Sequence, residues 1–212
     1  MDNEKYAQDL NHIKNMMNRS TRFISLSGLS GVFAGCYALV GAAVAATILS
    51  GSESYSGNYE QLESTFKFSE VLESLILVAI SVLILAIGTA IFFTTLKAKK
   101  NDQKIWDSTS KRILINFFGP LIIGGCFCLV LLQFQLVGLV APGMLIFYGL
   151  ALIHASKYTF DDLKGLGYAN AILGLIATQF IGYGLYFWAL GFGIFHIIYG
   201  ILMYNKFDKK SA

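Results

Sequence analysis

Six long apolar runs divide this chain and constrain its fold more than any other feature. They cover residues 23–49, 71–96, 113–132, 136–154, 163–180 and 186–204. A bilayer core takes about 20 residues of apolar helix, so each run is long enough to cross it or nearly so. A helix also satisfies its own backbone hydrogen bonds in hydrocarbon. The runs therefore predict an all-α polytopic membrane bundle of six transmembrane helices, with residues 1–212 forming one membrane domain.

Composition agrees with this class of protein. Charged residues make up 14% of the chain, roughly half of the ~25% that is usual in a soluble domain. The net charge of +3 does not indicate nucleic acid, because the cations occupy the segments between the apolar runs instead of forming one binding surface. We expect the bilayer itself to be the main partner.

The distribution of Lys and Arg predicts the orientation. Fifteen of the 16 lie in the N-terminal segment, in the loops after the second and fourth runs, and in the C-terminal tail. The opposite loops hold Lys67 beside Glu53, Glu60, Glu63 and Glu70. Because cytoplasmic loops carry the excess of Lys and Arg, both termini are predicted to be cytoplasmic.

Residues 1–22 predict an amphipathic helix in the cytoplasmic interface. Leu10, Ile13 and Met17 recur at helical spacing, with polar residues between them. The segment is interpreted either as a positive anchor for the first span or as a docking site for a partner. The first run has 27 residues, which exceeds the ~7–15 of a signal-peptide core, so an uncleaved span is expected.

Two polar residues are predicted to meet inside the bundle. His196 and Asn170 lie at similar distances, about 12 and 10 Å, from the cytoplasmic ends of their runs. We expect them to face each other or to share a third group such as Tyr148. His196 is then either an interhelical clip or a proton relay or ligand contact. No Asp or Glu lies deep in any run, and a relay normally uses such a carboxylate.

The first run also predicts a close helix contact. Ser27, Gly31 and Gly35 follow one another at four-residue steps, a pattern that lets two helix backbones approach closely. The contact can lie within the bundle or in a homodimer, and the pattern does not separate the two.

No pattern for catalysis, metal binding or a cofactor is present. Cys36, Cys126 and Cys128 lack the spacing of a zinc site, and neither a P-loop nor a Ser-His-Asp arrangement is found. His154 with Asp161 and Asp162 could bind a metal at the cytoplasmic face, but the composition of a short loop explains them equally well, and no metal site is assigned. The chain is therefore predicted not to be an enzyme, and no catalytic residue is assigned.

The last four runs contain a weak internal repeat. "LLQFQLVGL" at 131–139 resembles "ATQFIGYGL" at 177–185, and each stretch contains the short turn of one predicted hairpin. A duplicated hairpin is typical of some transporters. A small transporter or permeation protein built on these two hairpins is the alternative function.

Three stretches resemble an uncharacterised family of small bacterial six-span inner-membrane proteins. They are "RFISLSGLSGVFAGCYALVGA", "MLIFYGLALIHASKYTFDDLKGLGYANAILGL" and "YGLYFWALGFGIFHIIYGILMY". The resemblance implies the bacterial cytoplasmic membrane. It also points to a cytoplasmic regulator as a partner, because relatives are often encoded beside a small winged-helix transcription regulator. The function expected first is therefore non-enzymatic, through helix or regulator contacts.

Overall fold

Every regular element that the structure describes is a helix. The computed structural model describes residues 6, 27–53, 62–100 and 106–208. The long helices are α2 (Gly28–Glu53), α3 (Leu62–Lys100), α4 (Ser108–Gln133), α5 (Val140–Ala155) and α6 (Asp162–Ala177). Short 3-10 turns at Val137–Leu139 and Ser156–Tyr158 extend α5 at both ends. The all-α prediction is confirmed for these ranges, whereas the interfacial helix over 1–22 lies outside them except at Tyr6.

The last span is continuous but irregular. It begins with α7 (Gly184–Trp188), continues as the π-helix η3 (Ala189–Ile194) and α8 (Phe195–Met203), and ends in a second π-helix, η4 (Tyr204–Asp208). The spacing of apolar residues did not predict either π segment. A π turn changes the backbone hydrogen bonds and leaves the apolar composition as it is.

Within the residues that the structure describes, five helical segments are long and apolar enough to cross a membrane. They are Gly28–Gly51, Glu70–Lys100, Ser108–Gln133, Val137–Tyr158 and Gly184–Phe207. The fifth predicted span, over 163–180, is not among them and is shorter than expected, because α6 has 16 residues. At about 1.5 Å per residue it covers about 24 Å, less than the ~30 Å core. The chain turns after Ala177 and passes through Gly182, whose φ of 99° favours glycine.

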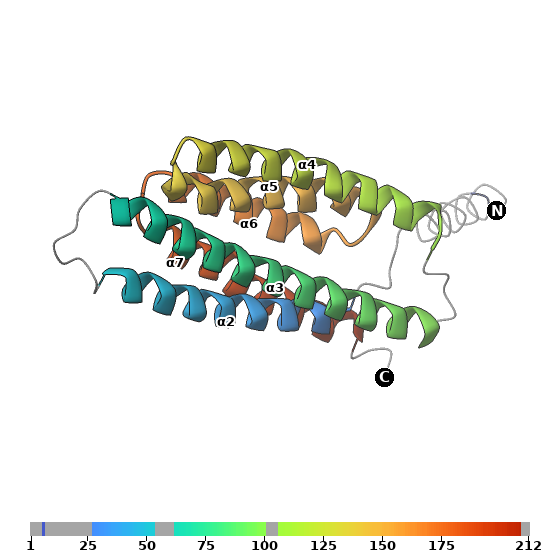
Figure 1. The fold of residues 1–212 in the computed structure, drawn as a ribbon. Coiled ribbons are helices and arrows are strands. Elements are labelled where there is room, and N and C mark those ends of the chain that lie inside the picture. Colours follow the sequence, from blue (N-terminus) through green and yellow to red (C-terminus); the bar gives the residue numbers. More distant parts are fainter. Residues whose placement is uncertain (1–5, 7–26, 54–61, 101–105, 209–212) are drawn as a thin grey trace.

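The helices form two groups that are joined through the last span. α5 packs against α4 and α6, while α2 packs against α3 and α8 (Figure 1). The fifth and sixth runs were expected to form a tight hairpin, and this is only partly so. A short turn connects them, but α6 packs mainly against α5 and α8 mainly against α2. Glycines explain this choice of partners.

The α5–α6 pair approaches closely at two facing glycines. A Cβ on Gly149 would lie 2.5 Å from the carbonyl oxygen of Gly167, and a Cβ on Gly167 would lie 2.8 Å from that of Gly149. Only glycine permits such backbone contact. The sequence analysis did not single out this pair.

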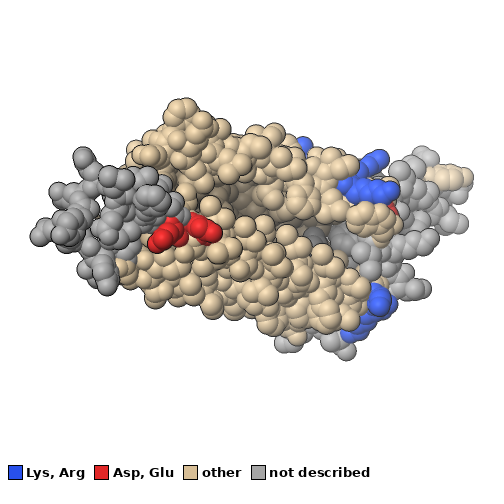
Figure 2. All heavy atoms as spheres, in the orientation of Figure 1, with Lys and Arg blue, Asp and Glu red and all other residues tan. Residues whose placement is uncertain are grey.

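Charge separates along the bundle. α3 carries Glu70 and Glu73 near its start and Lys97, Lys99 and Lys100 in its last turn. The space-filling view shows the acidic residues toward one end of the molecule and the basic residues at the other (Figure 2). Lys97 lies 5.8 Å from the ring centroid of Phe160, which places the α5–α6 connection at the basic end too.

Candidate functional site

A hydrogen bond joins Tyr148 on α5 to His196 on α8. The Tyr148 hydroxyl lies 2.6 Å from Nε2 of His196, and Nδ1 lies 2.9 Å from the Gly191 carbonyl oxygen. A carbonyl oxygen only accepts, so Nδ1 carries the proton. In the neutral ring Nε2 then accepts from the Tyr148 O–H. The imidazole is 7% exposed, and both its nitrogens are bonded.

The π-helix η3 places the Gly191 carbonyl beneath the imidazole. The backbone N–H of Phe195 bonds to Leu190 five residues earlier, which is the π spacing. His196 likewise lies five residues after Gly191, and its ring folds back to that carbonyl. Single π turns often occur at functional sites. In this chain the turn has a clear local role, because it gives the buried histidine a fixed acceptor.

Asn170 lies against the same glycine without bonding to His196 or Tyr148. Its side chain is fully buried, at 0% exposed, and Nδ2 donates to the Leu166 carbonyl of its own helix over 3.0 Å. Oδ1 has no hydrogen-bond partner. A Cβ on Gly191 would lie 2.7 Å from Oδ1. The structure thus brings Asn170 and His196 together at Gly191, but it does not link them by a hydrogen bond.

Aromatic rings surround the Tyr148–His196 pair. The centroid of Phe192 lies 4.9 Å from that of Tyr148 and 6.0 Å from that of His196, and Trp188 stands 5.2 Å from Phe192. Phe117 on α4 meets Tyr148 edge-on at 6.0 Å. The sequence analysis did not assign these three residues to the site. The spacing of Trp188, Phe192 and His196, four residues apart, is the signal that points to Trp188 and Phe192.

The small residues of the first span pack against the last span. A Cβ on Gly31 would lie 3.2 Å from Cα of Gly200, and one on Gly35 would lie 2.6 Å from the Gly193 carbonyl oxygen. Ser27 precedes the first turn of α2. Gly28 also belongs to this contact, because a Cβ there would clash with the backbone of Tyr204. In this structure the face is occupied within the chain.

The described residues do not assemble a candidate metal site. No group of three or more His, Cys, Asp or Glu side chains gathers there. Asp162, considered with His154, instead pairs with Lys206 over 2.8 Å at the surface. The site is therefore a hydrogen-bonded pair in an aromatic setting, with an unpaired amide oxygen nearby.

Comparison of the chain with protein families, curated proteins and solved structures found no match.

Proposed function

We propose that this chain is an integral protein of the bacterial cytoplasmic membrane that acts without catalysis, by binding another component along α3. In this proposal all six helices cross the bilayer, and both termini are cytoplasmic. The observation that carries it is the exposure of α3. The span of α3 is the most apolar of the candidate spans, yet no residue of its most apolar stretch is buried inside the structure.

One face of α3 accounts for its packing against α2. Val82 fits against Gly41, the Thr89 hydroxyl lies 3.2 Å from the Tyr37 hydroxyl, and Phe93 stacks on Phe33 at 5.5 Å. These α3 residues follow one another at helical spacing, so they form one stripe. The stripe leaves the rest of the helix uncovered.

The opposite face of α3 is a row of isoleucines. Ile80, Ile84, Ile87 and Ile91 lie about 200° around the helix from the residues that meet α2. Their side chains are between 44% and 64% exposed. We name this row the open face of α3. An apolar face of this length supports a position in the hydrocarbon of the membrane, because water would disfavour its exposure, and there it is free to contact another apolar component.

Photo-crosslinking at two α3 positions tests the proposal. A photoreactive phenylalanine at residue 84 reports on the open face, and one at residue 82 is the matched control that faces α2. The proposal expects residue 84 to give one discrete adduct with a component outside the chain, and residue 82 to give crosslinks within it. If residue 84 yields only bulk lipids in their membrane proportions, α3 has no selective partner.

Permeation is the second candidate, and the Tyr148–His196 pair favours it. A hydrogen-bonded histidine and an unpaired amide oxygen, both buried, are the kind of groups that line transport pathways. Proton and cation flux into proteoliposomes, measured for wild type and His196→Ala, tests this candidate. We expect flux no higher than in empty vesicles. Flux that falls in the variant would favour permeation over binding along α3.

A further inference from the structure

α6 presents an exposed apolar face. Glycines on its other side hold it against α5, where Gly167 meets Gly149 and a Cβ on Gly174 would lie 2.9 Å from the Pro142 carbonyl oxygen. The side chains of the exposed face are between 45% and 59% exposed, and they belong to Tyr168, Ile172, Leu175 and Ile176. In a helix that crosses the bilayer, an apolar face of this kind lies against lipid.

Charges close this face at the start of the helix. Asp162 pairs with Lys206 over 2.8 Å, and both side chains are exposed. Two residues further on, the Lys164 ammonium lies 5.7 Å from the ring centroid of Tyr168. Charged side chains are disfavoured in hydrocarbon, whereas lysine and tyrosine are common at the headgroup layer. The hydrocarbon beside α6 therefore begins after Lys164.

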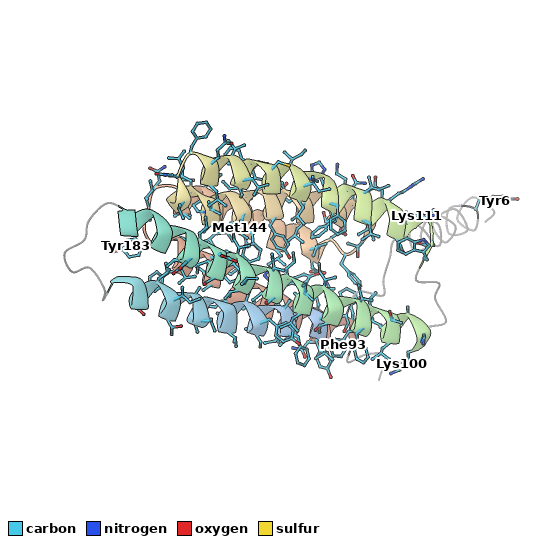
Figure 3. The ribbon with its side chains drawn as sticks, in the orientation of Figure 1. Tyr6, Phe93, Lys100, Lys111, Met144 and Tyr183 are labelled. Atoms are coloured by element: carbon cyan, nitrogen blue, oxygen red, sulfur yellow. The ribbon has the colours of Figure 1, made fainter. Side chains whose placement is uncertain are left out.

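An exposed turn closes the face at the other end. Residues 179–183 are exposed, and their backbone leaves the helix through Gly182 at φ 99°. Tyr183 in this turn lies at the end of the molecule opposite Lys100 (Figure 3). Irregular backbone that faces lipid does not occur within hydrocarbon. The hydrocarbon beside α6 therefore ends near Gln179.

These two ends leave a short apolar length along α6. From Lys164 to Gln179 the chain advances 15 residues, which is about 22 Å at about 1.5 Å each. α4 packs on the other side of α5 (Figure 1) and advances 21 residues from Arg112 to Gln133, or about 32 Å. The length along α4 matches a bilayer core of about 30 Å, and the length along α6 does not. Tilting α6 would shorten its reach further.

We propose that phospholipids with short acyl chains bind along α6, so that the bilayer is thinned on this side of the protein. This inference rests on the part of the proposed function in which all six helices cross the bilayer. A helix shorter than the core thins the bilayer around it, and short lipids lower the cost of that deformation. Tyr168 near one end, and Tyr183 and Tyr186 beyond the other, are exposed and suit the two headgroup layers. These interfacial residues favour lipid over a second protein on this face.

Tryptophan quenching by a brominated lipid tests the proposal in the full chain. Trp106 and Trp188 are replaced by phenylalanine, and a single tryptophan replaces Ile172 of α6 or Ile122 of α4. Both isoleucines are exposed and lie midway along the apolar lengths of their helices, so the two reporters are matched. The purified protein is reconstituted with dimyristoleoyl-phosphatidylcholine and the dibromide of dioleoyl-phosphatidylcholine, which quenches indole fluorescence. Fluorescence in the mixture, scaled to that in each pure lipid, gives the relative binding of the two lipids beside each tryptophan.

We expect residue 172 to favour the short lipid about threefold or more relative to residue 122, because α6 is mismatched to the long lipid and α4 is not. Leucines give a second matched pair. Leu175 and Leu129 are exposed, and each lies four residues before the glutamine that ends the apolar length of its helix. Tryptophans at these positions should show the same difference. The second pair keeps the test decisive if a tryptophan in the first pair disturbs folding, which the thermal midpoint reports.

Three results would overturn the inference. They are equal lipid ratios at the α4 and α6 reporters, a preference for the long lipid on α6, or no quenching on α6 in pure brominated lipid. The last result would show that a second copy of the chain covers this face. All three would leave six crossings and binding along α3 standing. Labelling of residues 164 and 183 from the same side of the membrane would instead show that α6 does not cross, which overturns the six crossings together with this inference.

Discussion

The Tyr148 hydroxyl donates to Nε2 of His196 over 2.6 Å, and this bond ties α5 to the last span. Because Nδ1 is held by Gly191, the ring cannot turn to another acceptor without losing that bond. The pair therefore fixes the position of α8 relative to the α4–α5–α6 group. It gives the buried histidine a structural role that can be measured as a coupling energy.

Removing either partner should reveal that coupling. Tyr148→Phe leaves Nε2 unpaired, whereas His196→Leu leaves the tyrosine hydroxyl unpaired. A double-mutant cycle, with unfolding followed in mixed micelles, should give an interaction of about 0.6 to 1.7 kcal/mol, the range of interhelical bonds in membrane bundles. Additive effects of the two substitutions would contradict a bond between these side chains.

Glycine substitutions should separate contact sites from open ones. A Cβ on Gly35 would lie 2.6 Å from the Gly193 carbonyl oxygen, and that backbone cannot move without shifting the last span. Gly35→Ala should therefore destabilise the bundle by about 1 to 3 kcal/mol. Gly88→Ala on α3 is the matched control, since nothing lies within 4 Å of a Cβ there. The control should be neutral or slightly stabilising, because alanine is a better helix former.

Equal losses in these two glycine variants would contradict the packing of α2 against the last span. Thermal unfolding in the same detergent measures both. A loss at Gly88 alone would place a partner or another helix on the open face of α3.

Asn170→Ala should cost less stability than its complete burial suggests. The amide donates only to the Leu166 carbonyl of its own helix, and Oδ1 is unpaired. Truncation thus removes no bond between helices, and we expect a loss of at most about 1 kcal/mol, the size of a modest packing defect. Unfolding in mixed micelles, run beside Tyr148→Phe, measures it. A loss well above that of Tyr148→Phe would show that Oδ1 has a partner in the membrane.

The Asp162–Lys206 ion pair should contribute little. The two side chains are 41% and 56% exposed, so water and salt screen their attraction. Asp162→Asn should change the free energy of unfolding by less than about 0.5 kcal/mol, with no further change in high salt. A larger loss would mean that the pair holds the end of the last span to the start of α6.

Much of the architecture follows from the apolar runs. The run over 113–132 corresponds to α4 at Ser108–Gln133, and the run over 186–204 falls within α7 to η4. The turn after α4 also agrees, because Gln135 at φ 59° closes it, with Leu136 bonding back to Leu131. Such agreement is expected where hydrophobic length and turn residues decide the structure.

The choice of helix partners was less accessible to sequence analysis. Short connections suggested that α6 and the last span would pair, but the facing glycines Gly149 and Gly167 bring α6 to α5. The same limit applies to the polar cluster. The positions of Asn170 and His196 along their runs predict that they lie at similar distances from the cytoplasmic ends. The spacing of apolar residues does not predict the π turn that places Gly191 between them.

The number of crossings is tested most directly on the two sides of α6, whose 16 residues are fewer than a bilayer core requires. Single cysteines replace Lys164 and Tyr183 in a chain whose three native cysteines are changed to alanine, and each is labelled with a membrane-impermeant maleimide. Six crossings predict that residue 183 reacts in intact cells whose outer envelope layer has been made permeable, and that residue 164 reacts only after the cytoplasmic membrane is permeabilised as well. If both residues react from the same side, α6 does not cross the bilayer, and the six-span account is wrong.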